Sequence, residues 1–277
     1  MIRISSMALP NPLKEKLALG HTVMGMWSIV PSPVVVEILG IAGLDFVLLD
    51  MEHGIFDTGA LDACIRACET TDASPLVRLP GANPSAAQWA LDLGAHGIIV
   101  PQVDTAEDAS HVVGMAKYAP IGHRGYNPFT RAADYSNPPD NTSGKLDNNF
   151  SLTAVIVESE RAIANLSAIC ATPSLDVVYV GVYDLAVAMG HQGDTRHVEV
   201  LTAVEAAIAT IRRSGKAAGM MVRTQAEIET ALALGANFLV YSVDTALILD
   251  AARSAVQQLA SQLNSSRISA PREGAAS

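Results

Sequence analysis

Aromatic residues, charged residues and cysteines are all scarce in this chain of 277 residues. Phe, Trp and Tyr make up 5% of it and charged residues 17%, whereas hydrophobic residues make up 49%. So much apolar material excludes a disordered chain and predicts a large core of aliphatic side chains. The three cysteines, Cys64, Cys68 and Cys170, do not form a disulfide framework, so we expect reduced thiols and a cytoplasmic protein.

The sequence disfavours two classes of partner, membranes and nucleic acid. No apolar run approaches the roughly 20 residues that span a membrane, and charges stand where a signal peptide needs its apolar segment. The net charge of −10 disfavours nonspecific attraction to nucleic acid or to an anionic membrane. An enzyme this acidic that takes an anionic substrate needs a metal or cations placed at its site.

Apolar runs alternate regularly with helical segments along the chain. The runs are continuous, as in parallel strands that are buried on both faces. Eight strands are predicted, over residues 22–29, 45–50, 75–79, 97–101, 152–157, 176–180, 217–222 and 238–241. Each precedes a helical segment, which favours a single (β/α)8 TIM barrel over residues 1–263 and a flexible tail at 264–277. A dinucleotide-binding fold is disfavoured, because no G-x-G-x-x-G follows the first strand.

The longest irregular segment, residues 122–149, is polar and rich in Pro, Asn and Gly. Loops of this length inside compact domains are uncommon and are often functional. We therefore expect this segment to be a lid over the site.

The chemistry of such a barrel lies where its strands end. Polar residues at or just after the predicted strand ends are Asp50, His53, Arg78, Gln102, Glu158 and Asp184. Glu158 and Asp184 are separated by one helix and so belong to adjacent strands. Two such carboxylates suit a hard divalent ion such as Mg²⁺ or Mn²⁺. The alternative is that both are N-caps of the helices that follow them.

Other polar residues at the mouth suggest acid–base chemistry. Asp50 and His53 are close enough in sequence to pair, and a histidine so oriented could act as a general base; a structural histidine is the alternative. Arg78 suits a carboxylate or enolate oxygen, with an ion pair to a neighbouring acid as the alternative. None of the five lysines ends a strand, and only Lys145 in the long segment could reach the mouth, which disfavours a Schiff-base aldolase.

Six motifs in chain order resemble one known family. They are DFVLLDMEHG (45–54), VRLPGANP (77–84), LDLGAHGIIVPQV (91–103), APIGHRGYN (119–127), VIVES (155–159) and GVYDLAVAMG (181–190). Together they resemble the HpcH/HpaI family of metal-dependent aldolases, from about residue 11 to about residue 245. The resemblance implies a (β/α)8 barrel, a divalent metal (Mg²⁺ or Mn²⁺, with Co²⁺ also suitable) and a pyruvate enolate as the common intermediate. It also implies a homohexamer, a trimer of dimers, with an exchanged C-terminal helix.

The resemblance also implies roles for individual residues. Glu158 and Asp184 match the metal ligands, Arg78 matches the arginine that binds the oxo acid, and His53 matches the base, with Asp50 as its orienting acid. The implied substrate contacts are Trp27, Gln102, Arg124, Val182, Tyr183 and, from a neighbouring subunit, Asp92. We expect the lid to bring Arg124 and Arg131 to the aldehyde half of the substrate.

The chain departs from the family pattern at two places. In the family pattern a glutamine that helps to hold the substrate carboxylate stands where this chain has Ile156, so we expect another group to bind the acid end. Val182 replaces a proline, and Tyr183 adds bulk beside Asp184. Both departures concern the identity of the substrate rather than the metal or the base.

We therefore expect a class II aldolase that makes or cleaves the bond between a pyruvate-type enolate and an aldehyde, a 4-hydroxy-2-oxo acid lyase. Its partners would be a small 2-oxo acid and an aldehyde. One alternative is a related carbon–carbon lyase or synthase acting on oxaloacetate, citrate-like acids or an acyl-CoA. Another is a barrel that binds a small acid without catalysis. A phosphate-binding isomerase is disfavoured, because VRTQ and YSVD after the last two strands lack a glycine-rich cradle.

Overall fold

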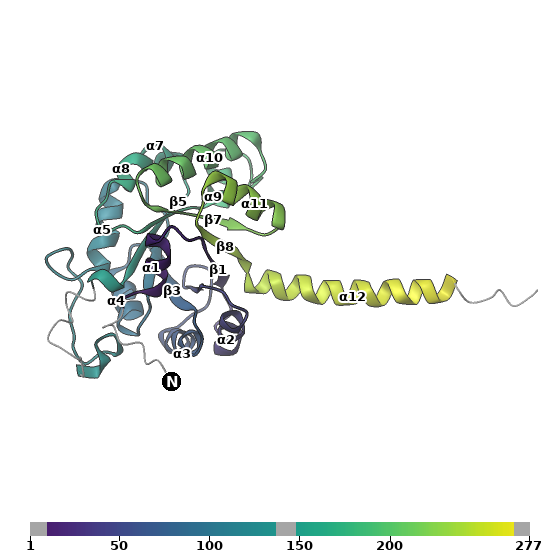
Figure 1. Ribbon diagram of the computed structural model, residues 1–277, viewed down its shortest axis with the longest axis horizontal. Coiled ribbons are helices and arrows are strands. Elements are labelled where there is room, and N and C mark those ends of the chain that lie inside the picture. The colour runs from purple at the N-terminus through teal and green to yellow at the C-terminus, as the bar shows by residue number, and fades with distance from the viewer. Residues whose placement is uncertain (1–9, 137–147, 269–277) are drawn as a thin grey trace, which may run out of the picture.

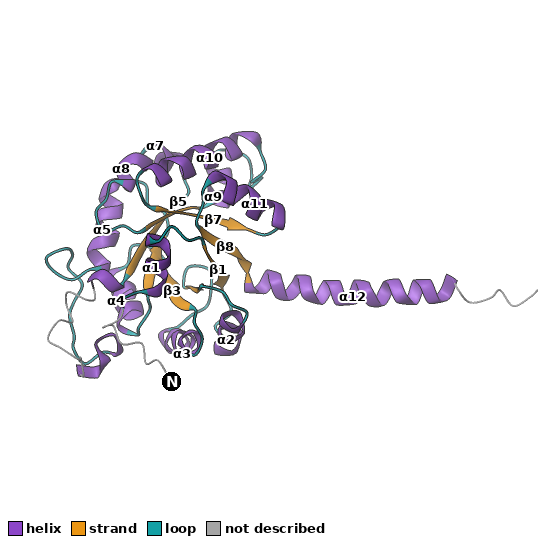
Figure 2. Cartoon of the chain, viewed as in Figure 1, coloured by secondary structure: helices purple, strands orange, loops and turns teal. Residues whose placement is uncertain are grey.

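The computed structural model describes residues 10–136 and 148–268. Predictions on the first nine residues, on Lys145 and on the tail from residue 269 lie outside the described residues. Eight parallel strands close into one barrel, in the order in which they occur in the chain (Figures 1 and 2). The predicted (β/α)8 TIM barrel is confirmed.

All eight strands lie within two residues of their predicted bounds. They are β1 (Val23–Ser28), β2 (Phe46–Asp50), β3 (Ser74–Arg78), β4 (Gly97–Val100), β5 (Leu152–Val157), β6 (Val177–Val180), β7 (Ala217–Val222) and β8 (Phe238–Val243). Their register places Asp50 beside Arg78 on neighbouring strands, and Ile156 beside Tyr179. Both pairs lie near the C-terminal ends of their strands, at the mouth of the barrel.

Helices surround the barrel and alternate with its strands. They are α1 (Pro12–Ala18), α2 (Pro33–Ile41), α3 (Thr58–Glu69), α4 (Pro84–Asp92), α5 (Ala106–Ala116), η1 (Arg131–Ser136, a 3-10 helix), α7 (Glu160–Ala164), α8 (Leu166–Cys170), α9 (Val182–Ala188), α10 (Val198–Arg213), α11 (Gln225–Leu234) and α12 (Asp244–Ile268). The sequence predicted neither α1 nor α9. Helices α7 and α8 are separate, because Asn165 between them leaves the helical conformation and its side chain donates to the Asp104 carbonyl at 2.9 Å.

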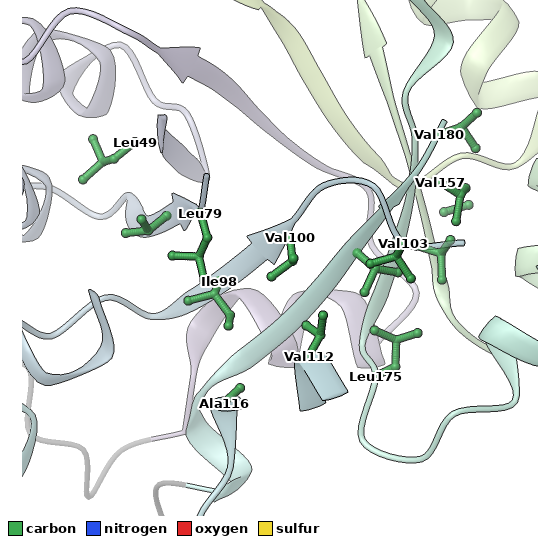
Figure 3. Packing of buried hydrophobic residues seen from close by; sticks show 14 of the residues in the cluster. Leu49, Leu79, Ile98, Val100, Val103, Val112, Ala116, Val157, Leu175 and Val180 are labelled. Atoms are coloured by element: carbon green, nitrogen blue, oxygen red, sulfur yellow. The ribbon is translucent and has the colours of Figure 1, made fainter. Parts of the chain in front are cut away.

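Two hydrophobic layers stabilise the barrel. The inner layer fills its interior and includes Phe46 stacked on Phe238, with ring centroids 4.3 Å apart. The outer layer lies between strands and helices, whose aliphatic side chains interdigitate (Figure 3). Successive strand residues point to opposite faces, so Val178 and Val180 belong to the outer layer and Tyr179 to the inner one.

Helix α1 closes the N-terminal end of the barrel. The side-chain oxygen of Asn11 accepts hydrogen bonds from the N–H groups of Leu13 and Lys14 and so caps this helix. Its amide nitrogen donates to the carbonyls of His96 and Phe150, at 2.8 Å each. Leu13 is buried in the inner layer, so α1 packs into this end of the barrel.

The described residues of the long polar segment, 122–136 and 148–149, are not part of the cavity wall at the mouth, so they do not form the expected lid over the site of their own chain. The segment follows α5 and precedes β5, and helix-to-strand connections lie at the N-terminal ends of barrel strands. Arg131 accordingly pairs with Glu69, at the end of α3, and donates to the Leu93 carbonyl beside α4 at 3.0 Å. Residues 137–147 of the segment lie outside the described part of the chain.

The last helix projects from the barrel instead of packing along it (Figure 1). This helix, α12, runs over Asp244–Ile268. Asp244 anchors its start, because its buried carboxylate accepts from the Ser28 hydroxyl at 2.9 Å. Further along, large apolar side chains such as Val256 and Leu259 are exposed. No helix in the described part of the chain is both long and apolar enough to cross a membrane.

Candidate active site

A cavity of about 300 Å³ opens at the C-terminal ends of the strands. Barrel enzymes place their chemistry at this end. The cavity walls include all five residues predicted for catalysis or metal binding, and three of the predicted substrate contacts: Asp50, His53, Arg78, Glu158, Asp184, Trp27, Val182 and Tyr183. Side chains from distant parts of the chain therefore meet around one cavity.

Glu158 follows β5, with its carboxylate partly buried. The backbone N–H of Gln102 donates to its Oε1 at 2.8 Å. Gly181 lies so close that a Cβ there would be 2.7 Å from Oε2. Burial raises the pKa of Glu158 to about 7; the Gln102 N–H opposes this rise, and the nearby charges of Asp184 and Glu52 add to it. Deprotonation of Glu158 near neutral pH would therefore be favoured by a cation.

Neither Glu158 nor Asp184 acts as a helix cap, so the structural alternative for this pair was wrong. Ser159 caps α7 and accepts from the Ala162 N–H at 3.0 Å. Asp184 lies inside the first turn of α9, which begins after Gly181. It faces the cavity and makes no hydrogen bond or ion pair with any residue that the structure describes.

The two carboxylates fit a hard divalent cation. Both carboxylates line the same cavity, and the nearby charge of Asp184 adds to the rise that burial causes in the pKa of Glu158. Neither forms an ion pair with a lysine or arginine among residues 10–136 and 148–263. Carboxylate oxygens with room for water are the ligands that Mg²⁺ and Mn²⁺ prefer.

Arg78, the last residue of β3, is held on three sides. Its Nε donates to Asp50 Oδ1 at 2.7 Å and its Nη2 to the other oxygen, while its Nη1 lies 3.1 Å from Glu52 Oε2. Its guanidinium carbon lies 4.2 Å from the centre of the Trp27 ring. The ion pair foreseen as an alternative is present, yet two of the five guanidinium N–H bonds are left for an oxygen in the cavity.

Glu52 is a site residue that the sequence analysis missed. Burial raises its pKa, and the neighbouring Arg78 guanidinium opposes this rise. The signal that could have identified it was its place between two predicted site residues, Asp50 and His53.

Asp50 does not orient the imidazole of His53, so the predicted carboxylate–imidazole pair was wrong. Its buried carboxylate binds Arg78, and Oδ1 also accepts from the backbone N–H groups of Glu52 at 2.9 Å and His53 at 3.2 Å. A bidentate guanidinium and a local turn therefore use the acceptors of Asp50. The imidazole remains 66% exposed, with its Nε2 3.9 Å from Glu52 Oε2.

Gln102 contributes through its backbone rather than through the predicted side chain. Its φ of +59° lies in the left-handed region, which is uncommon for residues other than glycine. This conformation points its N–H at Glu158. Its side chain is exposed and is not part of the cavity wall. Backbone strain of this kind is frequent at functional sites.

The floor of the cavity is the upper layer of the barrel interior. Trp27, Ile156 and Tyr179 belong both to this inner layer and to the cavity wall. The rings of Trp27 and Tyr179 meet edge to face, with centroids 5.7 Å apart. Tyr179 was not predicted as a site residue, although the alternation of side chains along β6 could have placed it inside the barrel.

Comparison with known proteins identifies the family to which this site belongs. The HpcH/HpaI aldolase/citrate lyase family matches residues 23–263. The chain belongs to this family. A 5-keto-4-deoxy-D-glucarate aldolase of Salmonella paratyphi C (strain RKS4594) is 33% identical over 252 residues, which cover 91% of this chain and 96% of the relative.

Solved structures agree with this assignment to the HpcH/HpaI family. A family member from Burkholderia cenocepacia J2315 matches with a TM-score of 0.85 and 31% identity, over 90% of this chain and 99% of that one. A citrate synthase matches with a TM-score of 0.82 and 26% identity, over 91% and 98%. The protein is therefore an aldolase, a carbon–carbon lyase, as the motifs predicted.

Two predicted substrate contacts of this aldolase lie away from the cavity of their own chain. Asp92 is the last residue of α4, at the N-terminal end of the barrel. Arg124 donates to Asp92 Oδ1 at 2.6 Å, and its guanidinium lies 4.6 Å from the centre of the Tyr118 ring. Neither is part of the cavity wall. A role for Asp92 in a neighbouring subunit stays a prediction.

A second cluster in this HpcH/HpaI aldolase has the composition of a metal site but not its geometry. The candidate ligand atoms of His191, His197 and Glu199 lie within 4.8 Å of one another. However, the two imidazoles stack, with centroids 3.6 Å and planes 17° apart, so their in-plane lone pairs do not converge on one ion. His197 Nδ1 instead accepts from the Glu199 N–H at 3.3 Å and caps α10.

Proposed function

We propose that this aldolase makes and cleaves the bond between a pyruvate-type enolate and an aldehyde, with a divalent metal held by Glu158 and Asp184. The observation that carries the proposal is a pair of carboxylates without a cationic partner, facing a cavity that also contains Arg78. Bound there, Mg²⁺ or Mn²⁺ would act as a Lewis acid on the ketone of a 2-oxo acid, and Co²⁺ fits the same donors.

Arg78 provides a fixed positive charge for the oxygen of the ketone. Asp50 and Glu52 hold its guanidinium before any substrate arrives, so little reorganisation accompanies the growth of negative charge on that oxygen. Its free N–H bonds can donate to this oxygen as the carbon–carbon bond breaks.

His53 is the candidate base for the aldehyde half. Its ring lines the cavity and is accessible, so it can take the proton of a 4-hydroxyl group during cleavage and return it during synthesis. Its orientation would come from Glu52 rather than from Asp50. Val182 and Tyr183, on the wall beside Asp184, are placed to contact the remainder of the substrate.

Removal of the metal tests this function. Protein treated with EDTA and then dialysed should release no pyruvate from a 4-hydroxy-2-oxo acid, and added Mn²⁺ or Mg²⁺ should restore the release. The substrate named for the relatives, 5-keto-4-deoxy-D-glucarate, is the first to assay. Full activity after thorough chelation would contradict the proposal.

One rival within the family has a specific observation in its favour. The citrate synthase that matches at 26% identity suggests condensation of an acyl-CoA with oxaloacetate or a related acid. Release of free thiol from acetyl-CoA in the presence of oxaloacetate and Mn²⁺ would identify this activity. We rank it second, because the aldolase relative is more similar in sequence.

We further propose a cytoplasmic homohexamer, a trimer of dimers. The projecting α12 with its exposed apolar side chains supports exchange of this helix between subunits. The position of Asp92 and Arg124, away from their own cavity, supports a role at the site of a neighbour. Three buried free thiols support a reducing compartment. Light scattering of the full chain measures the mass, and a monomer would contradict the assembly.

A further inference from the structure

A second cavity, of about 250 Å³, lies at the opposite end of the barrel from the candidate active site. Its walls come from α1, from the end of α10 and from the residues that lead into β6, β7 and β8. The connections that lead into the strands of such a barrel lie at its N-terminal end. No residue on the wall of this cavity also lines the cavity at the mouth, so the two are separate.

Positive charge is concentrated at this second cavity. Its wall contains three cationic side chains, Lys14, Arg212 and Lys216, and one carboxylate, Asp176. Nζ of Lys14 lies 3.1 Å from Asp176 Oδ1, and the other oxygen of Asp176 accepts from the Thr153 N–H at 2.8 Å. Arg212 and Lys216 form no ion pair with any residue that the structure describes. This local excess of positive charge occurs in a chain whose net charge is −10.

Both unpaired cations retain donors for a ligand. Nζ of Lys216 donates to the carbonyls of Leu175 at 2.7 Å and Thr172 at 3.2 Å, which leaves one of its three N–H bonds. Nη1 of Arg212 donates to the Lys216 carbonyl at 3.2 Å. A guanidinium has five N–H bonds, so most of those of Arg212 have no partner among the described residues. The contacts to carbonyls therefore hold both cations beside the cavity without using all of their donors.

The wall also contains a buried amide with an unused donor. Asn237 precedes β8 and is 4% exposed. Its Oδ1 accepts from the Ala218 N–H at 3.0 Å, and this contact distinguishes the two ends of the amide, because a backbone N–H needs an acceptor. Its Nδ2 has no hydrogen-bond partner among residues 10–136 and 148–263. A buried donor without a partner is costly, so an acceptor supplied by a ligand would be favourable.

We propose that this cavity binds a phosphate group, of inorganic phosphate or of a small phosphate ester, between Arg212, Lys216 and Asn237. The proposal is independent of the function proposed for the mouth. A phosphate carries about two negative charges near neutral pH, which matches the two cations that lack a carboxylate partner. Its oxygens point in tetrahedral directions, so they can accept from α10 and from the segments before β7 and β8 at once. The two oxygens of a carboxylate lie in one plane with its carbon and suit such a set of donors less well.

Calorimetric titration of the full chain with inorganic phosphate, at constant ionic strength, tests the proposal. The parent should bind one phosphate per chain, and phosphate should raise its thermal unfolding midpoint, because a ligand of the folded state stabilises it. Arg212→Met removes a charged donor and should weaken binding roughly 10- to 100-fold. Arg213→Met is the matched control. It changes the next residue of α10, which is not part of the cavity wall, and should bind phosphate as the parent does.

Asn237→Asp tests the buried amide separately. Its carboxylate can still accept from the Ala218 N–H, but it replaces the unused donor with a negative charge, so phosphate affinity should fall roughly tenfold or more. The shift that phosphate causes in the midpoint is compared, rather than the midpoint itself, so a change in basal stability does not affect the result.

Titration with glycerol 3-phosphate identifies the source of the phosphate group. Tighter binding than that of inorganic phosphate would support a phosphate ester as the ligand, and weaker binding would support free phosphate. Absence of saturable binding of either in the millimolar range would overturn the proposal. Phosphate binding by Arg212→Met within twofold of the parent would also overturn it, since the phosphate would then bind elsewhere. Acetate that binds as tightly as phosphate would overturn the assignment to a phosphate group.

Discussion

The two ends of the barrel contain charged groups whose partners differ. At the N-terminal end, Lys117 is almost fully buried, and its Nζ donates to the Ser151 hydroxyl at 2.9 Å and to the Asn148 carbonyl at 3.1 Å. At the mouth, Glu158 receives one backbone N–H, and Asp184 has no hydrogen-bond partner among the described residues. The charge of Lys117 is thus satisfied within the protein, whereas neither Glu158 nor Asp184 has a cationic partner among the described residues.

This difference suggests that the N-terminal end contributes to the stability of the fold and the mouth to its function. Removal of one partner from a buried, hydrogen-bonded charge is strongly destabilising, because the other group is left buried without a partner. A half-buried carboxylate with a raised pKa and a strained neighbour is costly in the ligand-free protein and becomes favourable when a cation arrives. Substitutions at the two ends should therefore separate activity from folding.

The largest effect is expected from Glu158→Gln at the mouth. It removes an anionic oxygen from the proposed metal site, so kcat/KM at fixed Mn²⁺ should fall by about a thousandfold, roughly 4 kcal/mol. The thermal unfolding midpoint of the metal-free protein should not fall, because the substitution removes a partly buried carboxyl group whose burial is costly. Glu160→Gln, an exposed neighbour, is the control. A variant that keeps a tenth of the activity would contradict the assignment.

The converse result is expected from Lys117→Met at the N-terminal end. The free energy of unfolding should fall by about 2 to 4 kcal/mol, because the oxygens that Lys117 binds lose their donor. The kcat should change less than threefold. Urea unfolding measures the loss. Lys16→Met breaks an exposed ion pair with Asp45 and should cost less than about 1 kcal/mol. Equal losses in both variants would remove the contrast between buried and exposed cations.

The free energy of unfolding should depend on pH because of Glu158 at the mouth. The raised pKa of Glu158, about 7, means that the folded metal-free protein holds a proton that the unfolded chain releases near pH 4.5. The stabilising contribution of Glu158 to the free energy of unfolding is therefore fully present below about pH 4.5. It is lost as the pH rises through 7, and the loss amounts to at most about 3 kcal/mol. Urea unfolding of the parent and of Glu158→Gln at several pH values gives the difference. A difference that does not change with pH would contradict the shift.

The smallest effect is expected from relief of backbone strain at each end. Gln102 at the mouth and Ser174, before β6, both have a φ of +59°. Replacement of either by glycine should raise the free energy of unfolding by about 0.5 to 1 kcal/mol. Activity should stay within a few-fold, since the Gln102 backbone N–H that reaches Glu158 is retained. A tenfold loss of activity in Gln102→Gly would show that its side chain is needed.

Much of the site was predictable because barrel topology converts sequence position into spatial position. A polar residue that ends a parallel strand must lie at the mouth, so Glu158, Asp184 and Arg78 were found from their place after apolar runs. The same rule, applied to the long polar segment, would have placed it at the opposite end. Its polar composition suggested a lid, but its place between a helix and the following strand decides its location.

The amino-acid sequence by itself determined the barrel, its strands and the convergence of the polar strand ends, because these follow from local periodicity and from the order of elements. Only the tertiary structure decided which partner each charge takes. Asp50 binds Arg78 rather than the His53 ring because strand register brings a guanidinium beside it, and register is a property of two distant segments. The direction of α12 and the meeting of Tyr179 with Trp27 likewise depend on packing across the whole barrel.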